Sequence, residues 1–372
     1  MTSGIVQPLP FDSTLPSFGP PFMAHVPASQ IEQIVPLTAS DGVGAVIVTQ
    51  SDTAVCRAVK AIRKVNPNAS ILIDKDRYSG RARRIGADGM GTAWINTQLH
   101  TLQLPWALTD SGYIPAGDTD ALMSVLAWGK RSDRIIVTLP LALDWLRRDI
   151  DQLIDRVAAA ECPVAIVLEA KGDPLSTRHA VQGLIKLLRA VNRALVLRCD
   201  TSTLGALAYG AAAVSVGVNS THRHLYPVTT PKDNENEFRR SKVRTSVFIP
   251  QLLTYKLLNE RLAAAIVLQP DADVWKCDCS QCMGRSLLWI TTTDGSADTA
   301  AFQHSLCAQV QLAKELLAVT PMERPGWWKD RCAIAQPKYG QITDPSSSQP
   351  WAAPGALKAW VSSTPTPQEL RG

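Results

Sequence analysis

The chain contains 372 residues, of which 45% are hydrophobic, and its formal net charge at pH 7 is +5. This length provides one large domain or two ordinary ones, with enough apolar material for a core. No apolar run reaches the roughly 18 residues of a membrane-spanning helix, and the first residues lack the basic and apolar regions of a signal peptide. We therefore expect a cytoplasmic protein without a membrane partner. The modest positive charge permits contact with nucleic acid without indicating it.

Residues 1–20 are rich in Pro, Ser and Gly, and we expect a flexible arm there. Short apolar runs then alternate with longer amphipathic segments, and such runs are typical of strands buried on both faces of a parallel sheet. Eight runs are found, at residues 22–26, 45–49, 71–74, 106–110, 134–138, 164–169, 194–198 and 213–217. Helical spacing is found at 51–64, 118–128, 143–159 and 178–191.

This alternation predicts an α/β fold, a closed (β/α)8 TIM-type barrel over residues 21–227, with an open doubly wound sheet as the alternative. Asp118 is expected to cap the helix at 118–128, and Thr201 or Ser202 a helix after the seventh run.

The alternation ends after the eighth run. Residues 228–334 hold a polar, basic segment at 228–246, helical patterns at about 250–268 and 299–318, and a cysteine cluster between them. We interpret this region as a zinc-binding subdomain with closing helices, inserted late in the chain. In residues 335–372 Pro, Ser, Gly and Gln dominate, so we expect a disordered or loosely packed tail.

The cysteine cluster has the spacing CxCxxC, from Cys277 through Cys279 to Cys282. Thiolates bind zinc well, and a structural zinc site closes its shell with four Cys or His ligands. His304, on the next predicted helix, is the expected fourth ligand, and Cys307 competes with it. The sequence therefore predicts one structural zinc ion, with an iron–sulfur fragment as the alternative.

A barrel followed by CxCxxC and a histidine resembles the tRNA-guanine transglycosylase family, the queuine and archaeosine tRNA-ribosyltransferases, over roughly residues 20–320. Members exchange guanine for a 7-deazapurine in tRNA, and relatives do so in DNA. The resemblance implies tRNA or DNA as the partner, a purine or 7-deazapurine base as the substrate, and a homo- or heterodimer as the assembly.

The resemblance also implies catalytic positions. By strand order Asp74 takes the place of the family's general acid/base and Asp110 that of the carboxylate that reads the guanine edge. By local motif, Asp110-Ser111-Gly112 instead resembles the third-strand signature, and both alignments stay open. The family's nucleophilic Asp lies on strand eight in a Phe-Asp-Cys-Val run, where this chain has Ser215. Asp200, at the end of strand seven, is the nearest carboxylate that could substitute.

Polar and aromatic side chains near the strand ends are candidates for substrate binding, although rim packing, loop capping or salt bridges would explain them equally. The candidates for the base, ribose or phosphate are Tyr78, Ser111, Gly112, Tyr113, Glu169, His222 and Arg223, with His224 beside them. The candidates for the nucleic-acid backbone are Arg239, Arg240, Lys242 and Arg244.

Two hypotheses follow. The first is a divergent transglycosylase-like enzyme that exchanges or removes a guanine or 7-deazaguanine base at an N-glycosidic bond. The alternative is a non-catalytic relative that has lost the nucleophilic Asp and serves as a nucleic-acid-binding or partner subunit. A third possibility is an unrelated barrel enzyme that carries a zinc knuckle.

Overall fold

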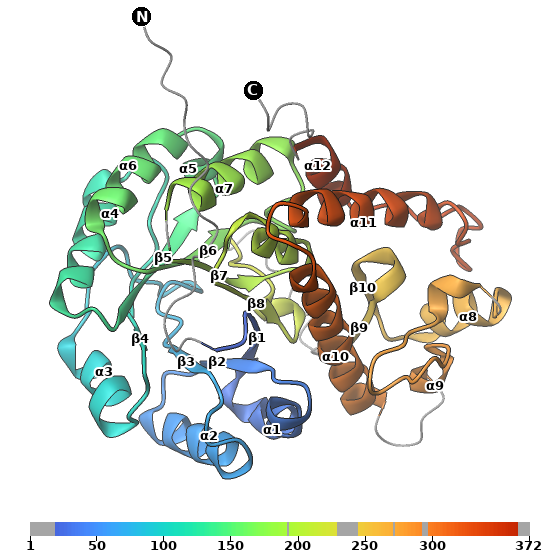
Figure 1. Ribbon diagram of the computed structural model, residues 1–372, viewed down its shortest axis with the longest axis horizontal. Helices are drawn as coiled ribbons and strands as arrows, with labels where there is room; N and C mark the ends of the chain where they lie inside the picture. The colour runs from blue at the N-terminus through green and yellow to red at the C-terminus, as the bar shows by residue number, and fades with distance from the viewer. Residues whose placement is uncertain (1–18, 192, 229–244, 271, 292–296, 364–372) are drawn as a thin grey trace, which may run out of the picture.

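Eight parallel strands form a nearly closed barrel in the computed structural model, which describes residues 19–191, 193–228, 245–270, 272–291 and 297–363 (Figure 1). The strands follow one another in the order β3-β2-β1-β8-β7-β6-β5-β4, and the end strands β3 and β4 lie next to each other. Their bounds are β1 Phe22–Pro27, β2 Gly44–Val48, β3 Ile71–Asp74, β4 Ala107–Leu108, β5 Ile135–Ala142, β6 Val164–Glu169, β7 Ala194–Cys199 and β8 Ala213–Gly217. The predicted TIM-type barrel is thus confirmed, with β4 shorter and β5 longer than expected.

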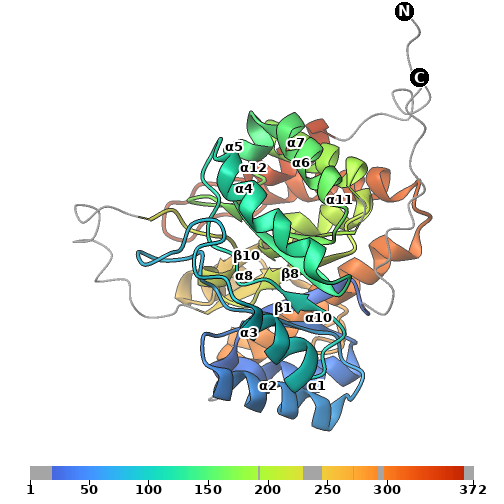
Figure 2. The ribbon, with the colours of Figure 1, turned by 90° about the vertical axis from the view of Figure 1, so that its left-hand side faces the viewer.

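Helices flank the strands, with α1 and α2 on one side of the barrel and α6 and α7 on the other in the turned view (Figure 2). Their buried faces carry the apolar residues at helical spacing, as in α2 with Val55, Val59 and Ile62. The helices of the barrel are α1 Ile31–Ser40, α2 Asp52–Val65, α3 Thr92–Asn96, α4 Thr119–Leu126, α5 Asp144–Arg147, α6 Ile150–Ala160 and α7 Arg178–Ala190.

Two expectations about these helices were wrong and one was confirmed. Asp118 caps α4, since its side chain accepts a hydrogen bond from the backbone N–H of Ala121 at 2.9 Å. The single helix expected over 143–159 is broken into α5 and α6. The short α5 lies so close to α7 that a Cβ on Gly183 would come within 2.0 Å of the carbonyl oxygen of Leu146. After β7 the chain forms a 3-10 helix, η4 Thr201–Tyr209, with Asp200 at its N-cap and no side-chain cap.

After β8 the described chain builds a separate small layer. β9 Ser246–Ile249 and β10 Thr254–Leu257 pair antiparallel around η8 Pro250–Leu252, followed by α8 Glu260–Leu268, η9 Asp273–Trp275, α9 Leu288–Thr291 and α10 Ala297–Ala318. The helix expected over 250–268 therefore begins only at Glu260. The turn that ends at Leu253, with φ of 51°, reverses the chain into β10 instead. Helix α10 packs against α1, β1 and η4 and takes the place of the eighth barrel helix.

Residues 335–363, which we expected to be loosely packed, are helical and well buried in part. They contain the end of α11 Arg324–Tyr339 and all of α12 Gly355–Ser363. Trp328 and Trp360 are fully buried and meet edge to face, with ring centroids 6.2 Å apart. A Cβ on Gly205 of η4 would lie 2.2 Å from Trp328 Nε1, so a glycine is needed where α11 meets the barrel. The Pro- and Ser-rich composition concealed this short apolar pattern.

Candidate active site and metal centre

The carboxyl ends of the barrel strands bring charged side chains to one rim, which we call the mouth, as expected for active sites in this fold. Asp74 ends β3, Asp110 follows β4, Glu169 ends β6 and Asp200 follows β7. The loop after β3, residues 75–91, joins them: its side chains contact Asp110, Glu169 and Arg198 of β7. The sequence-predicted carboxylates therefore share one region of the molecule, but their environments differ.

Asp74 and Ser215 belong to a polar network inside the barrel. Asp74 is 3% exposed, accepts a hydrogen bond from the hydroxyl of Tyr78 and lies 3.4 Å from His25 Nε2. The hydroxyl of Ser215, 0% exposed, lies 3.1 Å from His25 Nδ1 and accepts a hydrogen bond from the backbone N–H of Arg198 at 3.0 Å. Burial lowers the pKa of His25, which keeps this imidazole neutral. Both side chains are thus committed to contacts within the barrel.

Tyr78 is buried in the same network. Its ring is 1% exposed and its hydroxyl is used by Asp74, so it is packed under the rim and cannot stack on a base. Ser111 is also fully buried, where its hydroxyl pairs with that of Thr109 at 2.7 Å. Gly112 lies against the backbone of Arg84, where a Cβ would come within 2.5 Å of the carbonyl carbon. These residues shape the rim.

Asp110 is 4% exposed and lies at the rim itself. Its Oδ2 is 3.4 Å from Nε of Arg77, while its Oδ1 is buried and makes no hydrogen bond of normal geometry within the described residues. Burial raises the pKa of the Asp110 carboxyl, and Arg77, nearby backbone N–H groups and Lys75 oppose this rise. A ligand could therefore reach this carboxylate only after neighbouring side chains move.

Glu169 is contacted by Tyr113 and by Arg83, which belongs to the loop after β3. It accepts a hydrogen bond from the hydroxyl of Tyr113 at 2.5 Å and forms an ion pair with Arg83, also at 2.5 Å. The guanidinium of Arg83 lies 3.7 Å above the ring of Tyr113. Glu169 and Tyr113, which we predicted to bind substrate, therefore both contact Arg83 of the same chain instead.

Asp200 is partly exposed and hydrogen-bonded to His224, with 2.9 Å between Oδ2 and Nδ1. A second carboxylate, Asp173 in the loop after β6, interacts with it. Burial, followed by repulsion from Asp200, raises the pKa of Asp173 to about 7. Near neutral pH the Asp173 carboxyl can therefore hold or release a proton, as a general acid must.

Sequence reasoning missed Asp173 and Arg198. Asp173 lies four residues beyond Glu169, in the loop segment Lys171-Gly172-Asp173-Pro174, where its local sequence is that of an ordinary polar turn. Arg198 is 5% exposed inside an apolar strand; its guanidinium forms an ion pair with Asp76 and donates to the carbonyl oxygen of Thr221 at 3.0 Å.

His222 and Arg223, which follow β8, contact different parts of the molecule. His222 lies at the mouth, with Nδ1 2.6 Å from the side-chain oxygen of Asn219 and its ring centroid 6.0 Å from that of His25. Burial lowers the pKa of His222 to about 3, so it is neutral. Arg223 instead lies 3.5 Å above the ring of Tyr255 in β10 and links the barrel to the small layer. The predicted nucleic-acid cluster, Arg239, Arg240, Lys242 and Arg244, lies outside the described residues.

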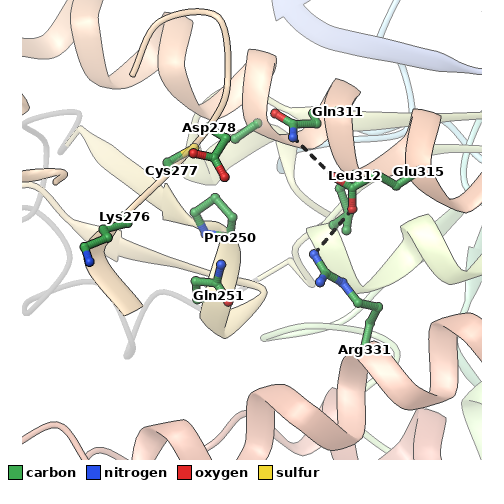
Figure 3. Close-up of a pocket in the computed structure, with 10 residues that line it drawn as sticks. Pro250, Gln251, Lys276, Cys277, Asp278, Gln311, Leu312, Glu315 and Arg331 are labelled. Atoms are coloured by element: carbon green, nitrogen blue, oxygen red, sulfur yellow. Dashed lines mark hydrogen bonds and ion pairs between the residues drawn. The ribbon is translucent and has the colours of Figure 1, made fainter. Parts of the chain in front are cut away.

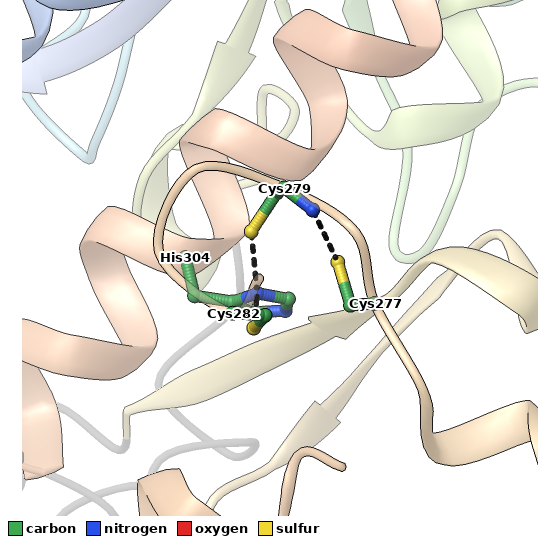
Figure 4. A group of neighbouring side chains, drawn as sticks. All are labelled: Cys277, Cys279, Cys282 and His304. Atoms are coloured by element: carbon green, nitrogen blue, oxygen red, sulfur yellow. Dashed lines mark hydrogen bonds between the residues drawn. The ribbon is translucent and has the colours of Figure 1, made fainter. Parts of the chain in front are cut away.

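The four predicted metal ligands come together. The ligand atoms of Cys277, Cys279, Cys282 and His304 all lie within 4.8 Å of one another, and all four residues are buried (Figure 4). The cysteines sit on one tight loop and the histidine on α10, which faces it. In a tetrahedral shell with metal–sulfur bonds of about 2.3 Å, the ligand atoms are roughly 4 Å apart, so the cluster can accept a single ion.

Neighbouring groups orient these ligands. His304 Nε2 lies 2.8 Å from the carbonyl oxygen of Phe248, so this nitrogen carries the proton and Nδ1 faces Cys279 Sγ at 3.4 Å and Cys282 Sγ at 3.1 Å. The indole N–H of Trp289 donates to Cys282 Sγ at 3.3 Å. Such contacts fix the histidine tautomer and stabilise thiolates in metal sites. Cys307 points to Asp41 at 3.7 Å and is not part of the cluster.

A small polar cavity of about 170 Å³ lies beside the loop that carries the three cysteines, residues 277–285, which we call the metal loop (Figure 3). It is lined by residues from the loop, η8, α10 and α11, among them Lys276, Gln251, Gln311, Glu315 and Arg331. Two of its charges are paired with each other, since Arg331 lies 3.5 Å from Glu315, which also accepts from Gln311 at 3.2 Å. We assign no ligand to this cavity.

A comparison with known protein families found no matching family model, and no curated protein sequence matches either. Among solved structures, 3-hexulose-6-phosphate synthase from Salmonella typhimurium is similar at 14% identity and a TM-score of 0.32, over 53% of this chain and 89% of that one. The 3-dehydroquinate dehydratase from Aquifex aeolicus VF5 is similar at 10% identity and a TM-score of 0.35, over 59% of this chain and 97% of that one. Within the described residues, no helix is long and apolar enough to cross a membrane.

Proposed function

We propose that the chain is a divergent tRNA-guanine transglycosylase-like enzyme that exchanges or removes a guanine or 7-deazaguanine base at an N-glycosidic bond in tRNA or DNA. The observation that carries the proposal is the interacting carboxyl pair Asp173 and Asp200 at the mouth. The raised pKa of Asp173, about 7, suits a proton donor at neutral pH, and Asp110 places at the same rim a carboxylate with one oxygen that has no hydrogen-bond partner among the described residues.

The chemistry of these groups suits cleavage of a bond between ribose and a base. Protonated Asp173 would donate its proton to the departing base, which takes the electron pair of the broken C–N bond. Asp200, held by His224, would face the ribose carbon, and its carboxylate would act either as the nucleophile or as the charge that stabilises the positive character of that carbon. Ser215 has no such role in this proposal, because it is enclosed between His25 and the backbone of Arg198.

Asp110 would read the base. An ionised carboxylate accepts two hydrogen bonds from adjacent N–H groups, and guanine presents such a pair on its edge. Adenine has no matching pair of donors on that edge. Asp110 therefore favours a guanine-type base over adenine.

We propose zinc as the ion of the Cys3His cluster. Three thiolates and one neutral imidazole are a usual structural zinc shell, whereas iron–sulfur clusters mostly use cysteine alone. The shell would be closed by the protein, so the ion would hold the metal loop to α10 and supply no reactive position. Free cysteines throughout the described chain also fit a reducing compartment such as the cytoplasm.

The non-catalytic alternative rests on a different observation. The strand-eight position holds Ser215, fully enclosed, and Asp74 is buried within the same network. A barrel of this kind that kept its base-reading carboxylate without a nucleophile would bind nucleic acid, or a catalytic homologue, without reacting. Whether the protein assembles as a homo- or heterodimer stays a prediction.

The deciding experiment incubates the protein with bulk tRNA, and separately with duplex DNA, together with labelled guanine or 7-deazaguanine. We expect label in one polymer, and we expect Asp200→Asn to reduce its rate at least about a hundredfold, because a nucleophile or charge stabiliser cannot be replaced by an amide. Asp155→Asn, exposed on the outer helix α6, is the matched control and should retain the rate.

Free base released without incorporation would indicate removal instead of exchange. If the folded, metal-loaded protein produces neither, but binds tRNA or DNA, the non-catalytic alternative holds. A wild-type rate in Asp200→Asn would remove Asp200 from the chemistry.

A further inference from the structure

The loop after β3, residues 75–91, places three charged side chains against oppositely charged residues of the mouth. Asp76 forms an ion pair with Arg198 of β7, Arg77 with Asp110 after β4, and Arg83 with Glu169 of β6. The carboxylates that a ligand would meet at Asp110 and Glu169 are thus each covered by an arginine of one loop.

The backbone of this loop is hydrogen-bonded to its neighbours, so a movement of its side chains is the simplest way to uncover the mouth. Its far end is tied to the β4 loop by hydrogen bonds from Gly86 N to Tyr113 O at 2.9 Å, from Gly112 N to Gly86 O at 2.7 Å and from Tyr113 N to Arg84 O at 2.7 Å. Its near end is held by Tyr78 on Asp74. Opening the mouth therefore means turning arginine side chains outward, not lifting the loop.

Arg77 is the side chain best placed to do this. Its side chain is 29% exposed while that of Asp110 is 3% exposed, so the arginine lies on the solvent side of the carboxylate. It is held by one contact of 3.4 Å to Asp110 and by a hydrogen bond to the carbonyl oxygen of Gly89 at 2.8 Å. Among the residues that the structure describes, none gives Asp110 Oδ1 a hydrogen bond of normal geometry. A partly solvated ion pair of this length is weak.

A guanidinium and a guanine edge present the same pattern to a carboxylate, a planar group with adjacent N–H donors. We propose that Arg77 is an autoinhibitory residue: its guanidinium occupies Asp110 in place of the base, and a base must displace it to bind. This inference rests on the proposed function, because it takes Asp110 as the base-reading carboxylate. It adds that a side chain of the protein itself, Arg77, competes with the base for Asp110.

The test measures binding of free guanine, with adenine as the comparison, by calorimetry on metal-loaded protein and without any nucleic acid. Arg77→Ala should bind guanine about three- to fivefold more tightly than the wild type, since a weak ion pair no longer competes. Adenine affinity should not change. Arg81→Ala, an exposed arginine of the same loop, should match the wild type, and Asp110→Asn combined with Arg77→Ala should abolish the gain.

Unchanged or weaker guanine binding in a folded Arg77→Ala protein would overturn the inference, and weaker binding would show that Arg77 positions Asp110. Guanine binding undetectable in wild type and variant alike would overturn it too. If Arg77→Ala does not fold, Arg77→Met replaces it, because methionine keeps the unbranched apolar stem without any hydrogen-bond donor. Tighter guanine binding without base exchange in the polymer assay would support the inference while the proposed enzyme activity fails. Base exchange with unchanged guanine affinity would do the reverse.

Discussion

Asp173 and Asp200 follow the neighbouring strands β6 and β7, but their carboxyl groups have different surroundings. Asp200 is stabilised by a hydrogen bond to His224, whereas Asp173 loses solvation and meets the negative charge of Asp200. The pKa of Asp173 therefore rises to about 7, and its ordinary partner within the loop, the backbone N–H of Leu175 at 2.9 Å, does not offset this rise. A proton held near neutrality is a functional property that also affects stability.

The stability consequence has a definite sign. The folded protein binds the Asp173 proton more tightly than the unfolded chain, so the free energy of unfolding falls as pH rises from the unfolded pKa of 3.8 to the folded value of about 7. Asp173→Asn should remove this dependence. Relative to the wild type, we expect the variant to gain stability across that window, on the order of 4 kcal/mol above pH 8.

Urea unfolding at a series of pH values measures this difference. Asp155→Asn, on the exposed face of α6, provides the control and should follow the wild type throughout. Parallel curves for Asp173→Asn and the wild type would mean that Asp173 has an ordinary pKa, and would weaken its assignment as the proton donor.

At the scale of elements, the metal loop has almost no regular structure of its own. Its backbone turns through residues 277–285 with few apolar side chains other than the cysteines, and α10 contacts it through His304. A bound ion would therefore supply folding free energy that packing does not.

We expect Cys279→Ser to lose its metal and to lower the melting temperature by several degrees or more, because the loop and α10 would no longer be joined. Cys307→Ser is the matched control, since this buried cysteine on the same helix points to Asp41 and lies outside the cluster. Elemental analysis and thermal unfolding measure the two effects. Equal metal content in both variants would contradict the proposed ligand set.

The elements that could be predicted from the sequence are those with a regular pattern of apolar residues. All eight barrel strands were found, because strands buried on both faces leave continuous apolar runs such as Val164–Glu169. The β9–β10 hairpin was missed since β10 is only partly buried and has no such run. Helix α12 was missed because Leu357 and Trp360 lie in a Pro- and Ser-rich context that concealed their helical spacing.

The candidate site was predictable only as a list of strand ends. Sequence position placed Asp74 and Asp110 equally well at the mouth, and both carboxylates are almost fully buried, at 3% and 4% exposed. What separates them is their neighbours, His25 and Tyr78 for Asp74 and Arg77 for Asp110, which come from distant parts of the chain. The metal ligands were found because three of the four are close in sequence.

At the scale of the whole molecule, the proposed substrate is a polyanion far larger than the mouth. The net charge of +5 is too small to hold tRNA or DNA by a general field, so contacts from a local basic cluster are needed. Arg239, Arg240, Lys242 and Arg244 supply the densest such cluster near the end of the barrel sequence, after β8. Their side chains would add phosphate contacts to base recognition at Asp110.

We therefore expect the double variant Arg239→Ala and Arg240→Ala to weaken binding of tRNA or DNA at low salt. Each lost phosphate contact releases about one counterion fewer, so the slope of log K against log salt should flatten by about 1.5 to 2. Lys60→Ala with Lys64→Ala, two exposed lysines on the outer helix α2, removes the same charge from another face and should leave most of the slope intact. Titrations across a salt series distinguish a local interface from net charge: equal flattening in both variants would show that only the total charge matters.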